Sequence, residues 1–507
     1  IQEHATLPIE LSNGRLNREL QRIKKTGQYE VSLPARTPTF CPGCPHRDSS
    51  SVLLELRQDF LDPEYMLRHH KRKPVDLVAH GDTGCYTMLM FEPNKPLMHN
   101  YSGMGLGGAT GAGVDPFIEN KQLVFMGDGT FYHSGQTSIA HSIYNGQDIT
   151  YIILDNKTTA MTGHQTHAGL EEGLTGEQLN ALDIERIVKG TVPKHLEKDV
   201  RIVRINPADR DRYRKLMEQT VLADGVKIVI ADKECAITYH RRVKREERQE
   251  IKQKGYLPKK TYMNVATEVC EFCLECTNQT GCPGLKIEDT DYGPKIQTDL
   301  SWCVNDGACQ RINACPSFEE VTVQRKQPKR MGDVHVPLDD LPEPPRPIHA
   351  DQETWRCYLA GVGGMGIGLC TAIMCTAGHE MGYHVQFLDK KGLAIRNGGV
   401  FSQLVFTRRD DGAQMDDPVL RPQSQGNAPQ NGHAPTERMP PTTPLIPYGK
   451  ADLLLGVDIL EATRALDPNQ QYRVASPEHT AAVVNTAKTP TVLTLMGDDD
   501  FKVSDLE

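Results

Sequence analysis

The sequence predicts an α/β protein in three parts: a doubly wound domain with a parallel sheet, a small cysteine-dense α+β region, and a second α/β domain. Three observations support this organisation. Residues 122–165 contain two apolar runs separated by a polar turn and a helical stretch, and residues 261–323 hold seven of the fourteen cysteines. Strand and helix patterns then resume after Trp355. We expect the main functional site to lie in the first of these segments, residues 122–165.

Length and composition narrow the class of protein. A chain of 507 residues has room for roughly three domains of ~100–200 residues each. The net charge of −9 is mild, so nothing indicates a nucleic-acid partner. There is no apolar run near the ~18 residues of a membrane helix and no signal-peptide pattern, so we expect a cytoplasmic protein with no membrane partner. In such a chain fourteen cysteines indicate metal ligation rather than disulfides. Three of them lie in apolar contexts and are expected in the core: Cys357, Cys370 and Cys375.

The segment from 122 to 165 has the pattern of a βαβ unit. An apolar run, Leu123–Met126, breaks into Gly127-Asp128-Gly129, and a helical stretch follows from about Ser134 to Asn145. A second apolar run, Ile149–Leu154, ends in Asp155-Asn156. Short apolar runs of this kind are typical of buried parallel strands. Both polar ends therefore face the same edge of the sheet, where ligands bind in doubly wound folds.

The residues at this edge suit a diphosphate carried by Mg²⁺. The Asp128 carboxylate, the Asn156 amide oxygen and the backbone carbonyl of Thr158 are hard oxygen donors, as Mg²⁺ prefers. Gly127 and Gly129 let the backbone approach phosphate, and the amides of the following helix end favour its charge. We therefore expect these five residues to bind the cofactor. The alternative is a Gly-Asp-Gly turn in an unrelated doubly wound domain.

Several motifs together resemble a known family. Gly-Asp-Gly followed after about 26 to 28 residues by Asn is the signature of the diphosphate-binding half of thiamine-diphosphate enzymes, and the glycine-rich GMGLGGATGAG precedes it here. With three further motifs, the chain resembles the thiamine-diphosphate domain of 2-oxoacid:ferredoxin oxidoreductases, most closely the indolepyruvate branch. These motifs are CPGCPH at 41–46, GDTGCYTM at 81–88 and DNKTTAMTGHQ at 155–165.

The cysteine-dense segment is close to the doubled bacterial ferredoxin pattern. It contains Cys270-x2-Cys273-x2-Cys276-x5-Cys282-Pro and Cys303-x2-Asp306-x2-Cys309-x5-Cys315-Pro. In ferredoxins three clustered cysteines bind one cluster and the Cys before Pro reaches across to the other. This logic assigns one 4Fe-4S cluster to Cys270, Cys273, Cys276 and Cys315, and a second cluster to Cys282, Cys303 and Cys309. The gaps of five residues differ from the ferredoxin gap of three. A pair of zinc sites is the alternative.

The second of these clusters lacks a fourth thiolate, because Asp306 stands where the middle cysteine is expected. A carboxylate is a harder and weaker ligand for iron than a thiolate. The cluster is therefore either 4Fe-4S, with Asp306 or solvent as the fourth ligand, or 3Fe-4S.

A third group of cysteines is assigned by resemblance alone. From spacing, these residues would be unrelated core thiols and a turn. The family resemblance implies that they hold a third 4Fe-4S cluster beside the thiamine cofactor: Cys41, Cys44, Cys85 and Cys235.

The resemblance also implies the reaction. The family catalyses coenzyme A-dependent oxidative decarboxylation of a 2-oxo acid to acyl-CoA and CO₂, and passes the electrons through iron-sulfur clusters to ferredoxin. The indolepyruvate-like motifs imply an aryl acid. No segment resembles the pyrimidine-binding domain that supplies the activating Glu, so we expect another chain or an upstream region to provide it within an oligomer.

Histidines follow the expected Mg²⁺ loop. His164 and His167, in GHQTHAG, are candidates for substrate contact or proton transfer, and His46 and His133 are weaker ones. A purely structural, hydrogen-bonding role is the alternative for each.

The sequence divides into six segments. Residues 1–36 form an N-terminal extension or fragment end with a candidate helix around 16–23, and residues 240–260 form a charged connector. That connector is either a solvated helix or a docking surface for an acidic electron carrier. The others are the thiamine domain with its proximal cluster at 37–239, the ferredoxin-like two-cluster domain at 261–323, a Pro-rich linker at 324–352, and an α/β domain at 353–507 with a disordered insertion at 411–449.

The last domain carries Gly361-x-Gly363-x-x-Gly366 between an apolar run and a helix. Alone this predicts a Rossmann site, with Asp389 near the expected acidic position. The resemblance instead implies a gamma-type domain that shapes access for substrate and coenzyme A. Packing glycines are a further alternative.

Three other functions remain open for the whole chain. One is a non-redox thiamine-dependent decarboxylase or carboligase, which would leave the clusters without a task. Another is an electron-transfer or scaffold subunit with a vestigial cofactor site. The third is an NAD-linked version of the same reaction.

Overall fold

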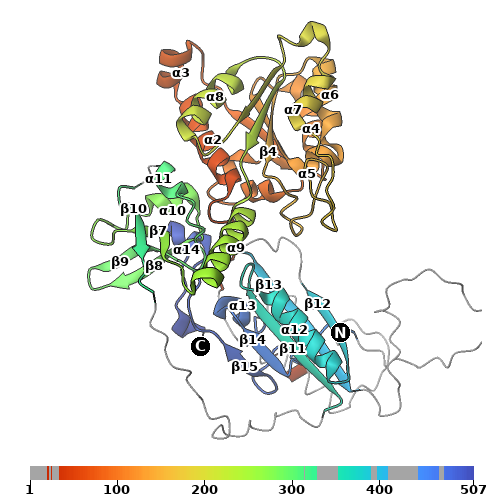
Figure 1. Cartoon of the computed structure of the whole chain (residues 1–507), viewed down its shortest axis with the longest axis vertical. Helices are drawn as coiled ribbons and strands as arrows, with labels where there is room; N and C mark the ends of the chain where they lie inside the picture. The colour runs from red at the N-terminus through yellow and green to blue at the C-terminus, as the bar shows by residue number, and fades with distance from the viewer. Residues whose placement is uncertain are drawn as a thin grey trace, which may run out of the picture.

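The computed structural model of the chain has three parts that meet near the centre of the molecule (Figure 1). It describes residues 20–21, 24, 33–312, 315–327, 352–389, 397–408, 443–467 and 473–506. Most of the predicted helix at 16–23, most of the linker at 324–352 and most of the insertion at 411–449 lie outside the described residues. Among the described helices, none combines the length and apolar character that a membrane span requires.

The first part is built on a six-stranded parallel sheet with strand order β2-β1-β3-β4-β6-β5. The two predicted apolar runs are neighbouring central strands, with Met126 opposite Ile153. This confirms an α/β domain with a parallel sheet. The strands are β1 (Leu77–Gly81), β2 (Asn100–Tyr101), β3 (Lys121–Gly127), β4 (Ile149–Asp155), β5 (Arg201–Ile205) and β6 (Lys227–Asp232).

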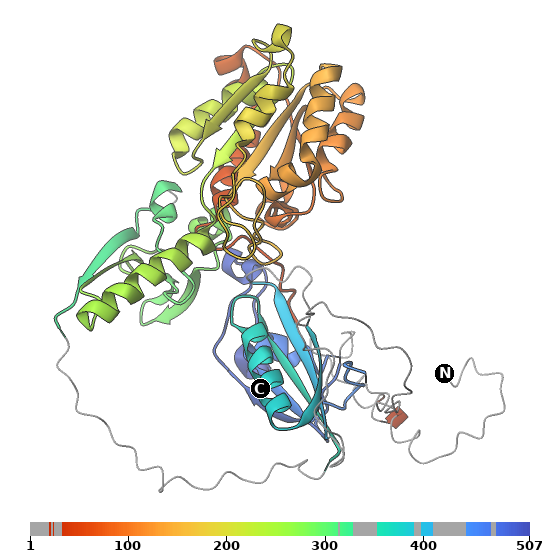
Figure 2. The same ribbon diagram turned by 45° about the vertical axis from the view of Figure 1, so that its right-hand side comes forward.

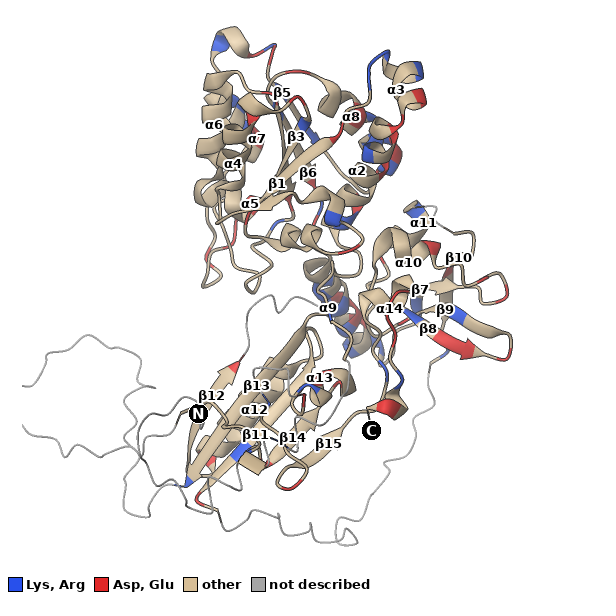
Figure 3. Ribbon diagram, turned by 180° about the vertical axis from the view of Figure 1, so that it is seen from behind, with Lys and Arg blue, Asp and Glu red and all other residues tan. Residues whose placement is uncertain are grey.

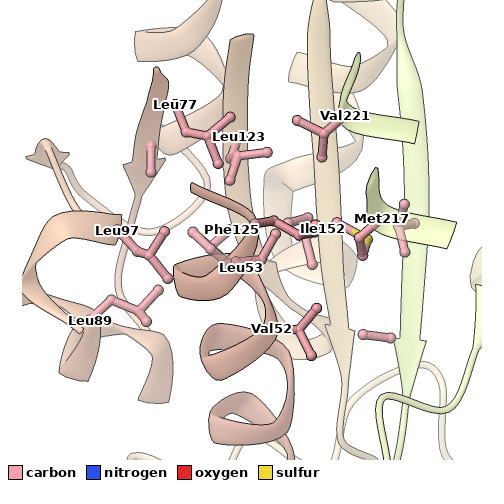
Figure 4. Packing of buried hydrophobic residues seen from close by; sticks show 14 of the residues in the cluster. Val52, Leu53, Leu77, Leu89, Leu97, Leu123, Phe125, Ile152, Met217 and Val221 are labelled. Atoms are coloured by element: carbon pink, nitrogen blue, oxygen red, sulfur yellow. The ribbon is translucent and has the colours of Figure 1, made fainter. Parts of the chain in front are cut away.

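Helices cover both faces of this sheet, as expected for a doubly wound domain. On one face Val52 and Leu53 of α2 (Pro45–Leu61) and Met217 of α8 (Arg210–Leu222) pack against Phe125 and Ile152 (Figure 4). The opposite face packs against α6 (Gln136–Asn145) and α7 (Ile184–Thr191). Two further helices complete the domain, α3 (Pro63–His70) and α4 (Gly107–Val114), with the short turns η1 (Cys85–Met90), η2 (Lys95–Leu97), η3 (Asp115–Phe117) and η5 (Lys194–Leu196).

The chain becomes helical as soon as β3 ends, which is earlier than the sequence indicates. A helical turn, α5 (Asp128–Thr130), leads into a π-helical turn, η4 (Phe131–Gly135), and then into α6. Single π-turns of this kind are frequent at functional sites. Asp128 therefore stands at the start of the helical segment.

The second part begins with α9 (Ala236–Lys254), a charged helix that leads from β6 towards the other parts (Figure 3). It begins directly after Cys235, before the predicted start of the charged connector at residue 240, and its i,i+4 ion pairs include Arg242–Glu246 and Lys254–Glu250. The cysteine-dense segment follows as two antiparallel ribbons, in which β7 (Lys259–Val265) pairs with β10 (Phe318–Gln324) and β8 (Leu285–Thr290) with β9 (Gly293–Thr298). Two short helices each carry one cysteine: α10 (Glu275–Thr280) carries Cys276, and α11 (Ala308–Ile312) carries Cys309.

The third part has a five-stranded mixed sheet with strand order β12-β13-β11-β14-β15. α12 (Ile367–Glu380) packs on one face, where Gly378 lies against Phe406 and Val385. The remaining elements are β11 (Thr354–Val362), β12 (Tyr383–Asp389), β13 (Gly399–Arg408), β14 (Leu453–Gly456), β15 (Ala481–Val484), α13 (Ile459–Thr463), α14 (Val492–Met496) and η8 (Val503–Asp505).

The three parts adjoin one another (Figure 2), and contacts between residues far apart in sequence join them. The buried Arg36 guanidinium lies 3.1 Å from Asp458 and 2.9 Å from Glu461 of the third part. Thr39 Oγ1 donates to the carbonyl of Gly281 in the second part at 3.1 Å. A β-carbon at Gly281 would lie 3.3 Å from Val492 of α14. All three parts therefore meet next to Cys282.

Candidate functional site

A cavity of about 80 Å³ opens at the carboxyl ends of β3 and β4, where the sequence predicts the cofactor site. Its walls come from five separate stretches of the first domain: the CPGCPH segment, the loop after β1, the glycine-rich stretch after β2, the turn after β3 and the loop after β4. They include His46, Thr83, Cys85, Tyr86, Met104, Asp128, Thr130, Asn156, Thr158 and Met161.

The three predicted Mg²⁺ ligands lie together in this wall. Asp128, Asn156 and Thr158 are all buried. The amide of Thr158 donates to Asp128 Oδ2 at 3.2 Å and to Asn156 Oδ1 at 3.3 Å, and Gly129 donates to Asp128 Oδ1 at 2.8 Å. Backbone amides therefore hold both side-chain oxygens on one side of the cavity. A carboxylate, an amide oxygen and a carbonyl in this arrangement fit Mg²⁺.

The His46 imidazole lies next to the side-chain amide of Asn156 and orients it. Its Nε2 lies 3.3 Å from Asn156 Nδ2, so a neutral imidazole can accept the amide proton and turn Oδ1 towards Asp128. Burial lowers the pKa of His46 to about 4, although the charge of Asp128 acts in the opposite direction. The ring is therefore neutral at pH 7, as an acceptor must be.

A network that the sequence reasoning missed ties three walls of the cavity together. Tyr86 donates to the Asp82 carboxylate and lies 3.1 Å from Thr130 Oγ1. Asp82 Oδ2 accepts from the amides of Gly105 at 3.1 Å and Gly107 at 3.4 Å, in the glycine-rich stretch. Burial raises the pKa of Asp82 to about 6. The motif GDTGCYTM contains Asp82 and Tyr86, but no spacing rule distinguishes their contact from an ordinary turn.

The structure separates the two candidate catalytic histidines. His167 Nε2 lies 3.1 Å from Asp128 Oδ2, and its ring stacks on Tyr132 with centroids 5.2 Å apart. The amide of Gly169 donates to His167 Nδ1 at 3.1 Å, so the ring proton of the neutral form sits on Nε2, beside Asp128. His164 instead lies beside α9, 3.5 Å from Thr238 Oγ1, and neither histidine is among the residues that line the cavity. His133 is exposed, with Nδ1 2.8 Å from Ser134 Oγ.

The four cysteines assigned by resemblance lie near one another at this cavity. Burial, followed by the neighbouring Cys41 thiol, raises the pKa of Cys44, and burial followed by Cys44, Cys41 and Cys235 raises that of Cys85. Cys85 also lines the cavity itself. We call Cys41, Cys44, Cys85 and Cys235 the proximal set.

Cys270, Cys273, Cys276 and Cys315 surround one cavity of about 280 Å³ in the second part, and we call them the outer set. Burial, then Cys315 and Cys270, raises the pKa of Cys276 to about 12. The structure thus brings Cys315 to the three clustered cysteines, as the ferredoxin logic predicts. Thiols with such pKa values remain protonated until a metal binds them.

Cys282, Cys303 and Cys309 line a different cavity, together with Asp306, and we call these three cysteines the middle set. Burial is the main reason that the pKa of Cys303 is raised to about 12. The cavity also has Pro42, Gly43 and Arg47 in its wall, which belong to the CPGCPHR stretch of the proximal set. The middle set therefore lies next to the proximal set.

Gly43 lies between Cys41 and Cys44 of the proximal set and packs against the residues beside the middle set. Its φ of +69° is in the left-handed region, and a β-carbon there would lie 2.6 Å from Val304 and 2.9 Å from Asp306. Only glycine avoids both problems at this position. This explains the Cys-Pro-Gly-Cys sequence in terms of packing against the second part.

The carboxylate of Asp306 is occupied by protein donors. Oδ2 lies 3.2 Å from Arg311 Nη2 and 3.4 Å from Lys233 Nζ, and Oδ1 accepts from the amide of Ala308 at 3.3 Å. Lys233 in turn pairs with the buried Asp48 at 2.5 Å. The role of Asp306 as an iron ligand stays a prediction, and these contacts compete with it.

Within the described residues, no group of three or more His, Cys, Asp or Glu side chains is arranged to hold a single metal ion. In a cubane cluster each thiolate binds a different iron, whereas the ligands of a zinc site share one ion. The choice between clusters and zinc stays a prediction.

The glycine motif of the third part lies between β11 and α12, but the sheet differs from a Rossmann unit. β13 lies between β11 and β12, so Asp389 at the end of β12 is two strands away from the glycine turn. Asp389 Oδ1 accepts a hydrogen bond from Ser402 at 2.5 Å. In a nucleotide site the acidic residue would follow the adjacent strand.

Comparison with known proteins bears on the class of the first domain. Residues 82–227 match the family described as thiamine pyrophosphate enzyme, C-terminal TPP binding domain. Strands β2 to β5 and the Asp128–Asn156 pair fall within this match, whereas β1 precedes it. The α/β fold with its parallel sheet is therefore typical of thiamine-diphosphate-binding domains.

The wider chain is similar to curated proteins named indolepyruvate oxidoreductase subunit IorA. It is 32% identical to that of Archaeoglobus fulgidus over 297 residues, covering 58% of this chain and 41% of the relative. It is 30% identical to that of Methanothermobacter marburgensis over 286 residues, covering 56% and 40%. The chain thus spans about two fifths of the length of these relatives. The resemblance predicted from the motifs is confirmed.

A solved structure of 2-oxoglutarate:ferredoxin oxidoreductase from Magnetococcus marinus is also similar, with 2-oxoglutarate, coenzyme A and succinyl-CoA bound. It is 16% identical, covers 43% of this chain and 72% of that chain, and has a TM-score of 0.32.

Proposed function

We propose that this chain is the thiamine-diphosphate and iron-sulfur component of an enzyme that oxidatively decarboxylates a 2-oxo acid and transfers the acyl group to coenzyme A. One observation carries the proposal. Asp128, Asn156 and Thr158, which suit a Mg²⁺-diphosphate, line the same cavity as Cys85 of the proximal set. A cofactor held there would touch the wall of a cluster site, an arrangement that a non-redox thiamine enzyme would not need.

The residues of this chain have distinct tasks in such a reaction. Asp128, Asn156 and Thr158 would hold the Mg²⁺-diphosphate, and Gly127 and Gly129 would allow its close approach. When bound, thiamine diphosphate supplies the electron sink for decarboxylation. His167, whose Nε2 lies 3.1 Å from Asp128 Oδ2, could orient that metal ligand or donate a proton.

The overall reaction balances without any further oxidant than ferredoxin. A 2-oxo acid, coenzyme A and two oxidised ferredoxins give acyl-CoA, CO₂, two reduced ferredoxins and one proton. The C1–C2 bond of the acid breaks, a thioester bond forms, and two electrons leave one at a time. Three cysteine sets provide places for three clusters along their path.

The geometry favours one order for these clusters. Cys85 of the proximal set lines the cofactor cavity, and Gly43 of the CPGC loop contacts Val304 and Asp306 beside the middle set. The outer set surrounds a separate cavity with none of the first domain in its wall. Electrons would therefore pass from the proximal to the middle to the outer set, and then to an external ferredoxin.

The substrate class and the partners come from the relatives. Curated proteins named indolepyruvate oxidoreductase subunit support an aryl 2-oxo acid such as indolepyruvate, and the word subunit supports a multi-chain complex. Another chain or an upstream region would supply the pyrimidine-binding domain and its Glu. The third part, with its gamma-type motifs, would shape access for coenzyme A.

The test is anaerobic reduction of ferredoxin, or a low-potential dye, by the native complex with coenzyme A. Indolepyruvate, phenylpyruvate, pyruvate and 2-oxoglutarate would be compared. We expect the aryl acids to have the highest kcat/KM. Preference for a small acid would refute the substrate class alone. CO₂ release without reduction would favour a non-redox decarboxylase, and absence of bound thiamine diphosphate would favour an electron-transfer subunit.

A further inference from the structure

Arg47 is a buried cation that forms no ion pair with a carboxylate among the residues that the structure describes. It lies in the first turn of α2, three residues after Cys44, and is 4% exposed. Its Nη2 donates to the carbonyl of Phe40 at 2.5 Å, whereas its Nε is buried without a hydrogen-bond partner in the described part of the chain. The nearby Asp48 already pairs with Lys233.

Such a group is costly unless something compensates it. Burying a charged side chain without a partner is unfavourable even after relaxation, and an unpaired N–H adds to that cost. A neutral hydrogen bond to Phe40 alone does not offset this. The position therefore indicates a missing anionic acceptor.

The groups around Arg47 identify that acceptor. Its side chain lines the cavity of the middle set, beside Cys282, Cys303 and Cys309. Burial alone would lower the pKa of Arg47, but Cys282, Cys44 and Cys41 hold it above its usual value. Arg47 thus lies between thiols of the proximal and middle sets. Iron-sulfur clusters bound by thiolates are anionic and accept hydrogen bonds at sulfur, which raises their potential.

We propose that Arg47 is a tuning residue shared by the proximal and middle clusters, whose buried charge and free Nε–H stabilise the reduced form of both. This inference rests on the proposed function only in assuming that the two cysteine sets hold clusters. A cation between the two sites makes each cluster easier to reduce, and favours the passage of an electron from the cofactor side towards the second part.

The experiment is a redox titration of the native complex followed by EPR, with three variants. Arg47→Gln removes the charge, and Arg47→Lys keeps it but removes the planar Nε–H. Arg57→Gln is the matched control, because Arg57 lies on the same helix and pairs with Asp76 at 2.8 Å, away from every cysteine set. Iron content and Mg²⁺-thiamine diphosphate binding are measured for each.

In Arg47→Gln we expect the equilibrium constant for reduction of the proximal cluster, and that of the middle cluster, to fall at least tenfold. This corresponds to a reduction potential 59 mV lower for a one-electron couple. Arg47→Lys should shift both in the same direction by less. The outer cluster in each variant, and all clusters in Arg57→Gln, should keep their potentials.

Unchanged potentials in Arg47→Gln with full iron content would overturn the proposal, as would an equal shift of all three clusters. If Arg47→Gln loses iron, Arg47→Lys decides, and native potentials there would overturn the proposal. The titration needs no substrate, so an inactive complex with the expected shifts would refute only the proposed function. A native complex without cluster signals would refute both.

Discussion

The amide of Cys235 donates to the carbonyl of Asn156 at 2.9 Å. One hydrogen bond thus joins a cysteine of the proximal set to a predicted Mg²⁺ ligand. The bond continues the β4–β6 pairing beyond the end of both strands, where Asp155 lies opposite Asp232. The loop that carries Asn156 and the loop that carries Cys235 therefore follow neighbouring strands of one sheet. Backbone pairing sets the position of one loop relative to the other.

Asp128→Ala should abolish binding of Mg²⁺-thiamine diphosphate while leaving iron content intact. The carboxylate is a metal ligand in our assignment and is not among the cysteine sets. Calorimetry with the cofactor and iron analysis check both points, and Asp211→Ala on the exposed side of α8 is the control. Loss of iron with the cofactor still bound would contradict the assignment.

His46→Ala should weaken Mg²⁺ binding in the presence of thiamine diphosphate by about 10–100-fold, the usual effect of losing a residue that orients a metal ligand. The imidazole accepts from Asn156, and without it the amide is free to rotate. His46→Gln, whose side-chain carbonyl can also accept, should recover part of the affinity. Equal affinity in all three proteins would mean that Asn156 is held by its backbone neighbours alone.

Asp306→Cys should convert any 3Fe-4S signal to a stable 4Fe-4S signal, because it supplies the missing thiolate. EPR of the oxidised and reduced complex distinguishes the two forms. Asp306→Asn is the control: it removes the ion pairs with Arg311 and Lys233 without adding a thiolate, so the signal type should not change. An identical spectrum in Asp306→Cys would place this residue away from the cluster.

Asp82 should make the first domain less stable as the pH rises from about 4 to about 6. Its pKa is raised from 3.8 to about 6 by burial, so the folded state binds the proton more tightly than the unfolded state does. The favourable contribution is present below about pH 4 and is lost as the pH passes through about 6. The shift corresponds to about 3 kcal/mol.

Asp82→Asn should therefore raise the thermal midpoint at pH 7 and have little effect at pH 4. The amide oxygen can still accept from Gly105 and Gly107, and the amide nitrogen can donate to Tyr86. Melting curves across this pH range measure the effect. A variant that is less stable at pH 7 would show that the ionised carboxylate is well compensated in the native protein.

The sequence anticipated local geometry better than contacts between segments. β3, β4 and the Asp128–Asn156 pair follow from apolar runs and polar turns, because period and burial act within a few residues. The joining of Cys315 to Cys270, Cys273 and Cys276 was also predicted, from ligand spacing. The unpartnered Nε of Arg47 and the Asp82–Tyr86 hydrogen bond could not be predicted from the sequence. Each depends on which distant loop packs beside the residue.

The ion pairs of Asp306 and the start of the helix at Asp128 could not be predicted from the sequence either. Composition suggests neither that Arg311 and Lys233 converge on one carboxylate nor that a π-turn replaces the predicted loop before α6. Both are tertiary effects that outweigh local propensity.

The junction at Gly281 has a consequence for how the protein is made. Thr39 and Gly281 are 242 residues apart, and Val492, which joins them, follows Gly281 by a further 211 residues. At about 5–20 residues per second, Val492 leaves the ribosome roughly 10–40 s after Gly281. The ribbons around Cys282 can form earlier, but their surroundings are completed only after Val492 has been synthesised. If the middle set holds the proposed cluster, insertion of that cluster has a time window set by translation, during which iron delivery competes with closure of the fold.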